Sequence, residues 1–445
     1  MESRDETISK TNRIIYAVIL CGTSCVTGSA SSLIGLSLPD IQCLLGIDLK
    51  VASSLLFAYG LGMCCSSLTG HFIRDNVDTT LCMVATLVLN AVAIAAIPIS
   101  PFVWLTFTLV LIAGWCTGIC RFVRILQCNI VWPTSFFGVF FVGTGASVSA
   151  IITPLIVKYF IQHRRLLPAG EPSGNTTRQI EEQRCDGFNS NIQYPYILIS
   201  GLGLLLAISL MISYTTYLQN GDVMEVTPRN NRKPTEQRSH SLTYIFLALG
   251  LGFTSSSGKV TFIELFATYG IRSQLHLSVG EMSVMMSAFS SGIFCSRLCS
   301  VFLSSRIRLE VLMLTYVVLV NVASVLFVLF KDTNIIMLWT NCIMYALGTG
   351  SMFPGLLSWI QKYSGSSKSP RLLNAIMFSS FVGVLVHPTL SSVFFGLFGP
   401  DAFVYAVTGM AFCQLFMFIG LWCISHNRKH EVNMNVTQDP LLNDQ

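Results

Sequence analysis

Charged side chains inside long apolar stretches are the residues of this sequence best placed to do chemistry. Lys259 and Glu264 lie five positions apart in one such stretch, about 140° apart on a helix, so each could face a cavity without pairing with the other. An ionisable group at the centre of a bilayer costs on the order of 3 kcal/mol. Either Lys259 lines a path for a polar solute, or it extends to the membrane surface while Glu264 lies near the outer rim.

Small hydroxyl residues come directly before this lysine. Ser256 and Ser257 belong to the run Ser255-Ser256-Ser257-Gly258, whose residues have poor helix propensity. The run predicts an unwound turn whose carbonyl and hydroxyl groups could bind a polyol. The alternative is a continuous helix in which each hydroxyl bonds to the backbone.

Three further arginines lie in apolar stretches. Arg121 and Arg124 share one helix face near the predicted cytoplasmic end of their stretch, where they either reach lipid phosphates or contact a substrate. For Arg297 we favour an interhelical latch, which bonds helix ends, over contact with a substrate.

A sugar site needs amide groups that bond hydroxyls and an aromatic ring that stacks on the sugar. The candidates by placement are Gln127, Asn129, Asn321, Asn341, Asn374 and His387 for polar contacts, and Trp115, Trp339 and Trp359 for stacking. Tryptophans at the ends of membrane helices are alternatively interface anchors. His387, directly before Pro388, either caps a kinked helix or serves a proton-linked step.

Composition places the protein in lipid. Charged residues make up 11% of the 445 residues, against roughly 25% in soluble domains, and hydrophobic residues make up 52%. A net charge of +5 without a basic block excludes a nucleic-acid binder. The sequence has no nucleophile elbow, P-loop or zinc-protease motif, so we expect neither an enzyme nor a metal or other cofactor.

Continuous apolar runs of about 20 residues predict an all-α membrane protein with twelve transmembrane helices in two six-helix halves. The predicted spans are 14–37, 50–72, 79–99, 102–125, 136–160, 195–217, 242–268, 282–303, 310–330, 334–358, 372–397 and 401–424. The predicted domains are an N-terminal half (1–218) with an outer loop (161–195), a cytoplasmic linker (219–240), a C-terminal half (241–425) and a cytoplasmic tail (426–445).

Basic residues give the orientation. With the N-terminus inside, the inner segments hold 18 Lys and Arg residues and the outer segments hold 8, which predicts that both termini are cytoplasmic. The sequon at Asn175 then lies outside, where it can be glycosylated. Cys43 and Cys185 are the cysteines predicted on the oxidising side, where they either form a disulfide or stay free.

Several short segments, in this order and spacing, resemble a known transporter family. They are Gly35 to Asp40, Gly62 with Asp75, Gly118 with Trp132, Gly143 to Ala146 with Pro154, Tyr194 to Tyr196, Phe289 to Leu298, Phe353-Pro354 and Gly383 to Pro388. The chain thereby resembles, over nearly its whole length, the sodium-dependent glucose transporter 1 family, also called major facilitator domain-containing protein 4, of the major facilitator superfamily. We assign structural or gating roles to Asp40, Asp75, Arg121, Arg297, Gly143, Gly145 and Pro388.

The resemblance implies transport of a hexose such as glucose by alternating access, with a substrate site near the midplane between the two halves. The acid and amide positions of the family carry Arg121, Ile125, Lys259 and Val384 here, so sodium coupling is doubtful and symport is open. The rivals are an organic anion carrier and a non-transporting receptor or scaffold. The expected partners are a small solute and the lipid bilayer; the oligomeric state is open. We favour the plasma membrane, although the dileucine at 439–442 makes an endolysosomal membrane possible.

Overall fold

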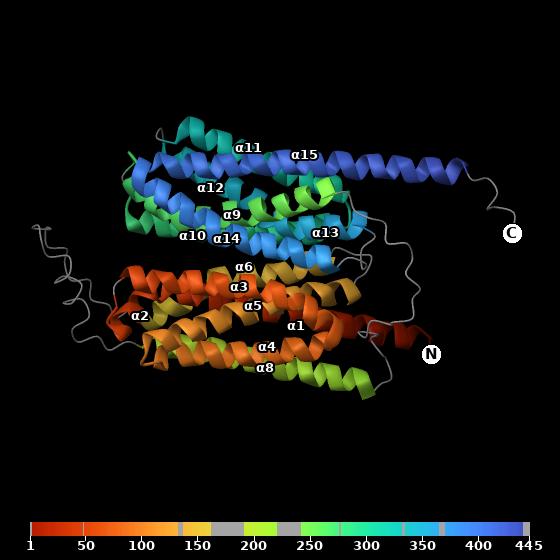
Figure 1. Cartoon of the computed structure of the whole chain (residues 1–445), viewed down its shortest axis with the longest axis horizontal. Helices are drawn as coiled ribbons and strands as arrows, with labels where there is room; N and C mark the ends of the chain where they lie inside the picture. The colour runs from red at the N-terminus through yellow and green to blue at the C-terminus, as the bar shows by residue number, and fades with distance from the viewer. Residues whose placement is uncertain are drawn as a thin grey trace, which may run out of the picture. The chain divides into compact units, whose positions relative to one another are not determined.

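The computed structural model describes residues 2–47, 49–131, 137–161, 191–219, 242–275, 277–331, 334–364 and 370–438. Within these ranges the chain is helical and contains no β-strand (Figure 1). Ten segments are long and apolar enough to cross a membrane. The predicted all-α membrane class is therefore confirmed.

The chain divides into two compact units. The first unit comprises residues 1–131 and 141–228, and the second comprises residues 132–140 and 229–445. Most of the predicted linker and of the predicted outer loop lies outside the described residues.

Six long helices of the first unit correspond to its six predicted spans. With the short helices between them, they are α1 (Glu2–Leu36), α2 (Leu38–Leu45), α3 (Leu49–Asn76), α4 (Thr79–Ala96), η1 (Ile97–Ile99), α5 (Val103–Val131), α6 (Phe137–Ile161) and α8 (Gln193–Gln219). In α3 the apolar part is shorter, Ser54–Gly70, so it is not among the ten segments above.

The second unit also has six long helical segments, one of them divided in two, but its first helix is not among the ten apolar segments above. Its helices are α9 (Leu242–Arg272), α10 (Val279–Leu303), α11 (Leu309–Phe330), α12 (Ile335–Gly350), α13 (Met352–Ser364), α14 (Pro370–Phe398) and α15 (Asp401–Gln438). Ser351 separates α12 from α13, which together make one span, Ile335–Ile360. Helix α15 extends well beyond its predicted span, through most of the predicted tail.

The predicted unwound turn at Ser255–Gly258 is wrong, because α9 is continuous through these residues. The Ser255 and Ser257 hydroxyls donate to the carbonyl oxygens of Gly252 and Thr254, at 3.2 and 3.3 Å. Each hydroxyl thus has a partner without any break of the helix, as the backbone-bonded alternative predicts.

An aromatic cluster anchors the inner face of α9. The ring of Phe262 lies 4.4 Å from that of Phe266, 4.7 Å from Phe289 of α10 and 4.8 Å from Tyr345 of α12, between ring centroids. All four rings are buried, so the cluster fixes the rotation of α9 within the second unit. That rotation decides which of its polar residues can meet α14.

Glycines let α3 and α5 cross closely in the first unit. A Cβ atom on Gly62 would lie 2.2 Å from the Leu111 carbonyl oxygen, and one on Gly114 would lie 2.1 Å from that of Tyr59. Backbone atoms cannot move aside as side chains can, so any larger residue forces the two helices apart.

We therefore expect Gly114→Ala to destabilise the protein by about 1–3 kcal/mol, the usual cost of overpacking. The matched control is Gly201→Ala in α8, where the added Cβ meets nothing within 4 Å. The measurement is the melting temperature of both variants in the same detergent. Equal melting temperatures would show that the close crossing does not exist.

Candidate functional site

A row of polar contacts joins α9 to α14 in the second unit. The hydroxyls of Ser256 and Ser380 are 2.5 Å apart, and the Ser379 hydroxyl donates to the Leu249 carbonyl oxygen at 2.7 Å. Gly383 allows this approach, because a Cβ there would lie 2.7 Å from the Phe253 carbonyl oxygen. We call this row the α9–α14 seam; it places hydroxyl groups between two long helices of the second unit.

The seam continues to His387. Its Nδ1 lies 2.6 Å from the Thr261 hydroxyl oxygen, and which atom donates depends on the tautomer. Among the described residues the other ring nitrogen, Nε2, has no hydrogen-bond partner, so it can bond a ligand. Helix α14 runs unbroken through Pro388, so His387 lies inside the helix and does not cap it.

A cavity of about 460 Å³ opens between α14 and α15 beside this histidine. Its lining comprises His387, Leu390, Ser391, Phe394, Phe398, Asp401, Ala402, Tyr405 and Ala406. The lining combines a few polar groups with apolar and aromatic side chains, the usual make-up of a small-molecule site.

An ion pair holds one residue of the cavity lining. Lys331, which follows α11, pairs with Asp401 at the start of α15. The Lys331 ammonium also lies 5.6 Å from the centroid of the Tyr405 ring, within cation–π range. Tyr269 of α9 donates to the Lys331 carbonyl oxygen at 3.1 Å. These contacts fix the positions of Asp401 and Tyr405.

Lys259 and Glu264 lie on α9 near the seam but do not pair. Lys259 is half-buried and makes contacts of its own, and Glu264 is exposed. In the part of the chain that the structure describes, Glu264 makes no hydrogen bond or ion pair. Whether Lys259 lines a solute path therefore stays a prediction.

The other candidates of the second unit lie in its interior. Ser257 is completely buried and bonded to its own helix. Asn341 of α12 is 3% exposed, and its Nδ2 has no partner among the described residues. Trp359, a predicted stacking residue, is completely buried and packs against Phe418, so no sugar can stack on it.

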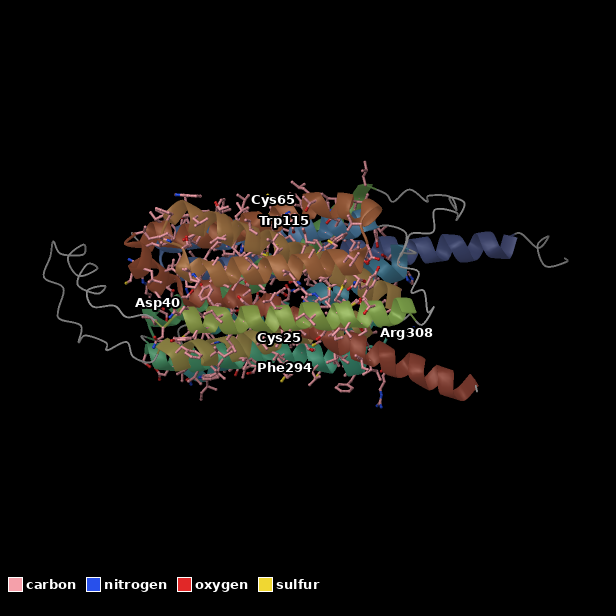
Figure 2. All side chains as sticks on the ribbon, turned by 90° about the horizontal axis from the view of Figure 1, so that it is seen from below. Cys25, Asp40, Cys65, Trp115, Phe294 and Arg308 are labelled. Carbon is pink, nitrogen blue, oxygen red and sulfur yellow. The ribbon has the colours of Figure 1, made fainter. Side chains whose placement is uncertain are left out.

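The candidates of the first unit are bonded within it. Gln127 of α5 donates to the Thr80 hydroxyl at 3.2 Å, and the Trp115 indole donates to the Thr69 hydroxyl at 3.2 Å. Figure 2 shows Trp115 part-way along the unit. The side chain of Asn129 lies outside the described part of the chain.

The two arginines of α5 differ in their surroundings. Arg124 is 4% exposed and donates from Nη2 to the Thr27 hydroxyl of α1 at 3.2 Å, so the prediction that it reaches lipid phosphates is wrong. Its guanidinium instead points toward Thr27 of α1. Arg121 is half-buried and has interactions of its own.

The residues assigned to structure and gating are spread over both units. Arg297 of α10 donates from Nε to the Gly350 carbonyl oxygen, at 2.9 Å, where α12 ends. A Cβ on Gly145 would lie 2.2 Å from the Cys21 carbonyl oxygen, whereas Gly143 is half-buried. Asp40 is buried in the first turn of α2, near one end of its unit (Figure 2). Pro388 is buried within α14.

Some predictions fall on residues whose side chains or positions the structure does not describe. They are Asp75, Asn175 and Cys185. Cys43 is disulfide-bonded, but since Cys185 lies outside the described residues, their pairing stays a prediction. Among the described residues no group of three His, Cys, Asp or Glu side chains could hold a metal ion.

Sequence reasoning missed Thr261, Ser380 and most of the cavity lining. One signal was available, because His387, Ser391, Phe394 and Phe398 recur at the spacing of a single helix face. Thr261 carried no such signal, since its partner lies 126 positions away.

Comparison with known proteins agrees with this architecture. A family model described as Major Facilitator Superfamily matches residues 20–388. The curated Sodium-dependent glucose transporter 1 of Danio rerio is 22% identical over 399 residues, which cover 86% of this chain and 65% of that protein. The chain thus spans less than two thirds of the length of this relative.

Solved structures share the fold at low sequence identity. The transporter FucP, in its outward conformation, has a TM-score of 0.69 and 16% identity, over 92% of this chain and 98% of its own. The proton:xylose symporter XylE, bound to 6-bromo-6-deoxy-D-glucose, has a TM-score of 0.66 and 10% identity, over 94% and 96%. A bacterial homologue of the iron transporter ferroportin has a TM-score of 0.65 and 12% identity, over 91% and 98%.

Proposed function

The chain belongs to the Major Facilitator Superfamily, and from this premise we propose that it carries a hexose such as glucose across a membrane. The superfamily is one of membrane transporters that work by alternating access, and the chain is an integral multi-pass membrane protein of this kind, not an enzyme. The part that goes beyond family membership, and that we propose, is the class of solute.

The observation that carries the hexose proposal is the mixed lining of the cavity beside His387. A monosaccharide presents hydroxyl groups at its edge and C–H groups on its faces. His387 and Ser391 can bond hydroxyls, while Phe394, Phe398 and Tyr405 offer rings for the faces. The names of the relatives point the same way, because they include a glucose transporter and a xylose symporter.

We propose supporting roles for the other candidates. Ser256 ties α9 to α14, and Lys259 contacts the solute path beside the seam. Arg297 holds the end of α12 and acts as a latch between helices. Ser257 and Asn341, which are buried in the structure, influence the site through packing.

An organic anion is the second candidate solute. Arg121, Lys259 and Arg297 place three positive charges within predicted spans, where they outnumber the negative charge of Glu264. A carboxylate solute would be attracted by such an excess of positive charge. Hexose remains first, because the cavity lining holds His387 and Asp401 but neither arginine nor lysine.

Uptake by purified protein in lipid vesicles separates the candidates. Radiolabelled glucose and radiolabelled lactate are supplied in parallel to vesicles with protein and to protein-free vesicles. We expect saturable, protein-dependent uptake of glucose. Uptake of lactate alone would support the organic anion carrier, and uptake of neither would support a receptor or scaffold.

We also propose that both termini are cytoplasmic, with the plasma membrane as the favoured location. The basic residues predict that Asn175 faces outward, so glycosidase treatment of protein from a glycosylating host should increase its gel mobility. Asn175→Gln should abolish that shift. An unshifted wild-type protein whose loop at 161–195 resists external protease would reverse the orientation.

A further inference from the structure

Arg124 carries a positive charge that no carboxylate offsets in the described residues. Its guanidinium donates from Nη2 to the neutral Thr27 hydroxyl, and Nη1 has no hydrogen-bond partner. The side chain is 4% exposed and lies in a helix that is apolar enough to span a membrane. An arginine does not lose its proton in proteins, so the charge persists wherever the side chain is buried.

The amide of Gln127, next to this arginine along the helix, also has one atom that is unpaired within the described residues. Gln127 lies three positions further along α5, on the same helix face, and donates from Nε2 to the Thr80 hydroxyl at 3.2 Å. Its Oε1 is buried without a partner in the described structure. If the amide is turned over, the Thr80 hydroxyl donates to Oε1, and Nε2 becomes the unpaired atom and a donor.

With the amide turned over, two unpaired donors, one of them charged, share one helix face and can bind an anion. A water molecule could satisfy their hydrogen bonds, but it could not offset the charge of the guanidinium. From this we infer that Arg124 Nη1, with Gln127, binds a small monovalent anion inside the first unit. The inference does not depend on the hexose proposal, because the cavity beside His387 belongs to the second unit.

The occupant is a small group with a single negative charge. Either chloride or the carboxylate of a solute has these properties. The test uses the full chain in detergent and measures its melting temperature in chloride, in lactate and in sulfate at equal ionic strength. The variant is Arg124→Gln. The matched control is Arg306→Gln, which removes an exposed arginine from the loop between α10 and α11.

We expect chloride or lactate to raise the melting temperature of the wild type and of Arg306→Gln by about 4 °C relative to sulfate, at an anion concentration about 100-fold above its dissociation constant. Arg124→Gln should lose this rise. A rise with chloride alone identifies a resident halide. A rise with lactate, together with uptake of labelled lactate, identifies a carboxylate solute.

Binding of radiolabelled chloride to wild-type protein decides the question even if Arg124→Gln does not fold. We expect saturable binding of close to one chloride per chain, or displacement of the bound chloride by lactate. The inference is wrong if the wild type binds no chloride saturably and melts at the same temperature in all three salts. That result would leave the glucose proposal standing, since labelled glucose uptake is measured separately.

Discussion

Solute uptake into vesicles should be the same whether the external cation is sodium or choline. Sodium binding in a membrane protein requires several oxygen ligands that replace water. At the positions where the resemblance implies acid or amide groups, this chain has Arg121, Ile125, Lys259 and Val384. A sodium ion within about 6 Å of Lys259 would meet a repulsion of about 3 kcal/mol at an effective dielectric of about 20, which lowers its affinity on the order of 100-fold.

The substitution Lys259→Glu should change cation dependence or solute selectivity more than it changes stability. Lys259 is half-buried, so its replacement leaves the buried core of α9 in place. Lys259→Gln is the matched control, because it removes the positive charge without adding a negative one. Uptake by the wild type that rises several-fold with an inward sodium gradient would show that Lys259 does not exclude sodium.

Replacing His387 with phenylalanine should lower solute uptake by about 10- to 100-fold. The substitution removes the ring nitrogen that is free to bond a ligand, and a ligand group left without its hydrogen bond costs about 1–3 kcal/mol. The Thr261 hydroxyl can then donate to its own helix backbone, so the loss of stability should be smaller than the loss of uptake.

The control for this variant is Thr389→Val, two residues along the same helix. Thr389 is exposed and its hydroxyl donates to the Leu385 carbonyl oxygen of its own helix, at 2.8 Å. Its uptake should match the wild type. If His387→Phe transports at the wild-type rate while retaining its melting temperature, the cavity beside His387 is not the solute site.

The positions of the spans could be predicted because they depend on one local property. An apolar run of about 20 residues indicates a membrane helix whatever its neighbours are. Two helix starts carry local signals that the span predictions did not use: Asp78 caps α4, and Ser278 with Glu281 forms a capping box on α10. Each of these signals lies within a few residues of the helix that it defines.

The serine run of α9 shows where local reasoning failed. Poor helix propensity predicted a break, but Ser256 has a partner in Ser380, 124 positions away, and the aromatic cluster holds the helix from its other side. Propensity is a weak prior that tertiary packing overrides. Nothing near Ser256 in the sequence identified its partner.

The surroundings of the charged residues could not be predicted for the same reason. The position of Arg124 along its span predicted how deep the residue lies in the membrane. It did not predict where the side chain points, so both lipid phosphates and a substrate stayed candidate partners. The contact with Thr27 depends on how α1 and α5 pack, which the apolar pattern of either helix alone does not fix. The cavity likewise could not be predicted, because its lining comes from both α14 and α15.

Counterflow of glucose tests the proposed transport most directly. Vesicles that contain the purified protein are loaded with unlabelled glucose and diluted into a trace of labelled glucose. A carrier that works by alternating access returns to the outside faster when loaded, so labelled glucose should accumulate transiently inside and then decline. If labelled glucose enters preloaded and empty vesicles at the same rate, or only as fast as it enters protein-free vesicles, the chain does not transport hexose by alternating access.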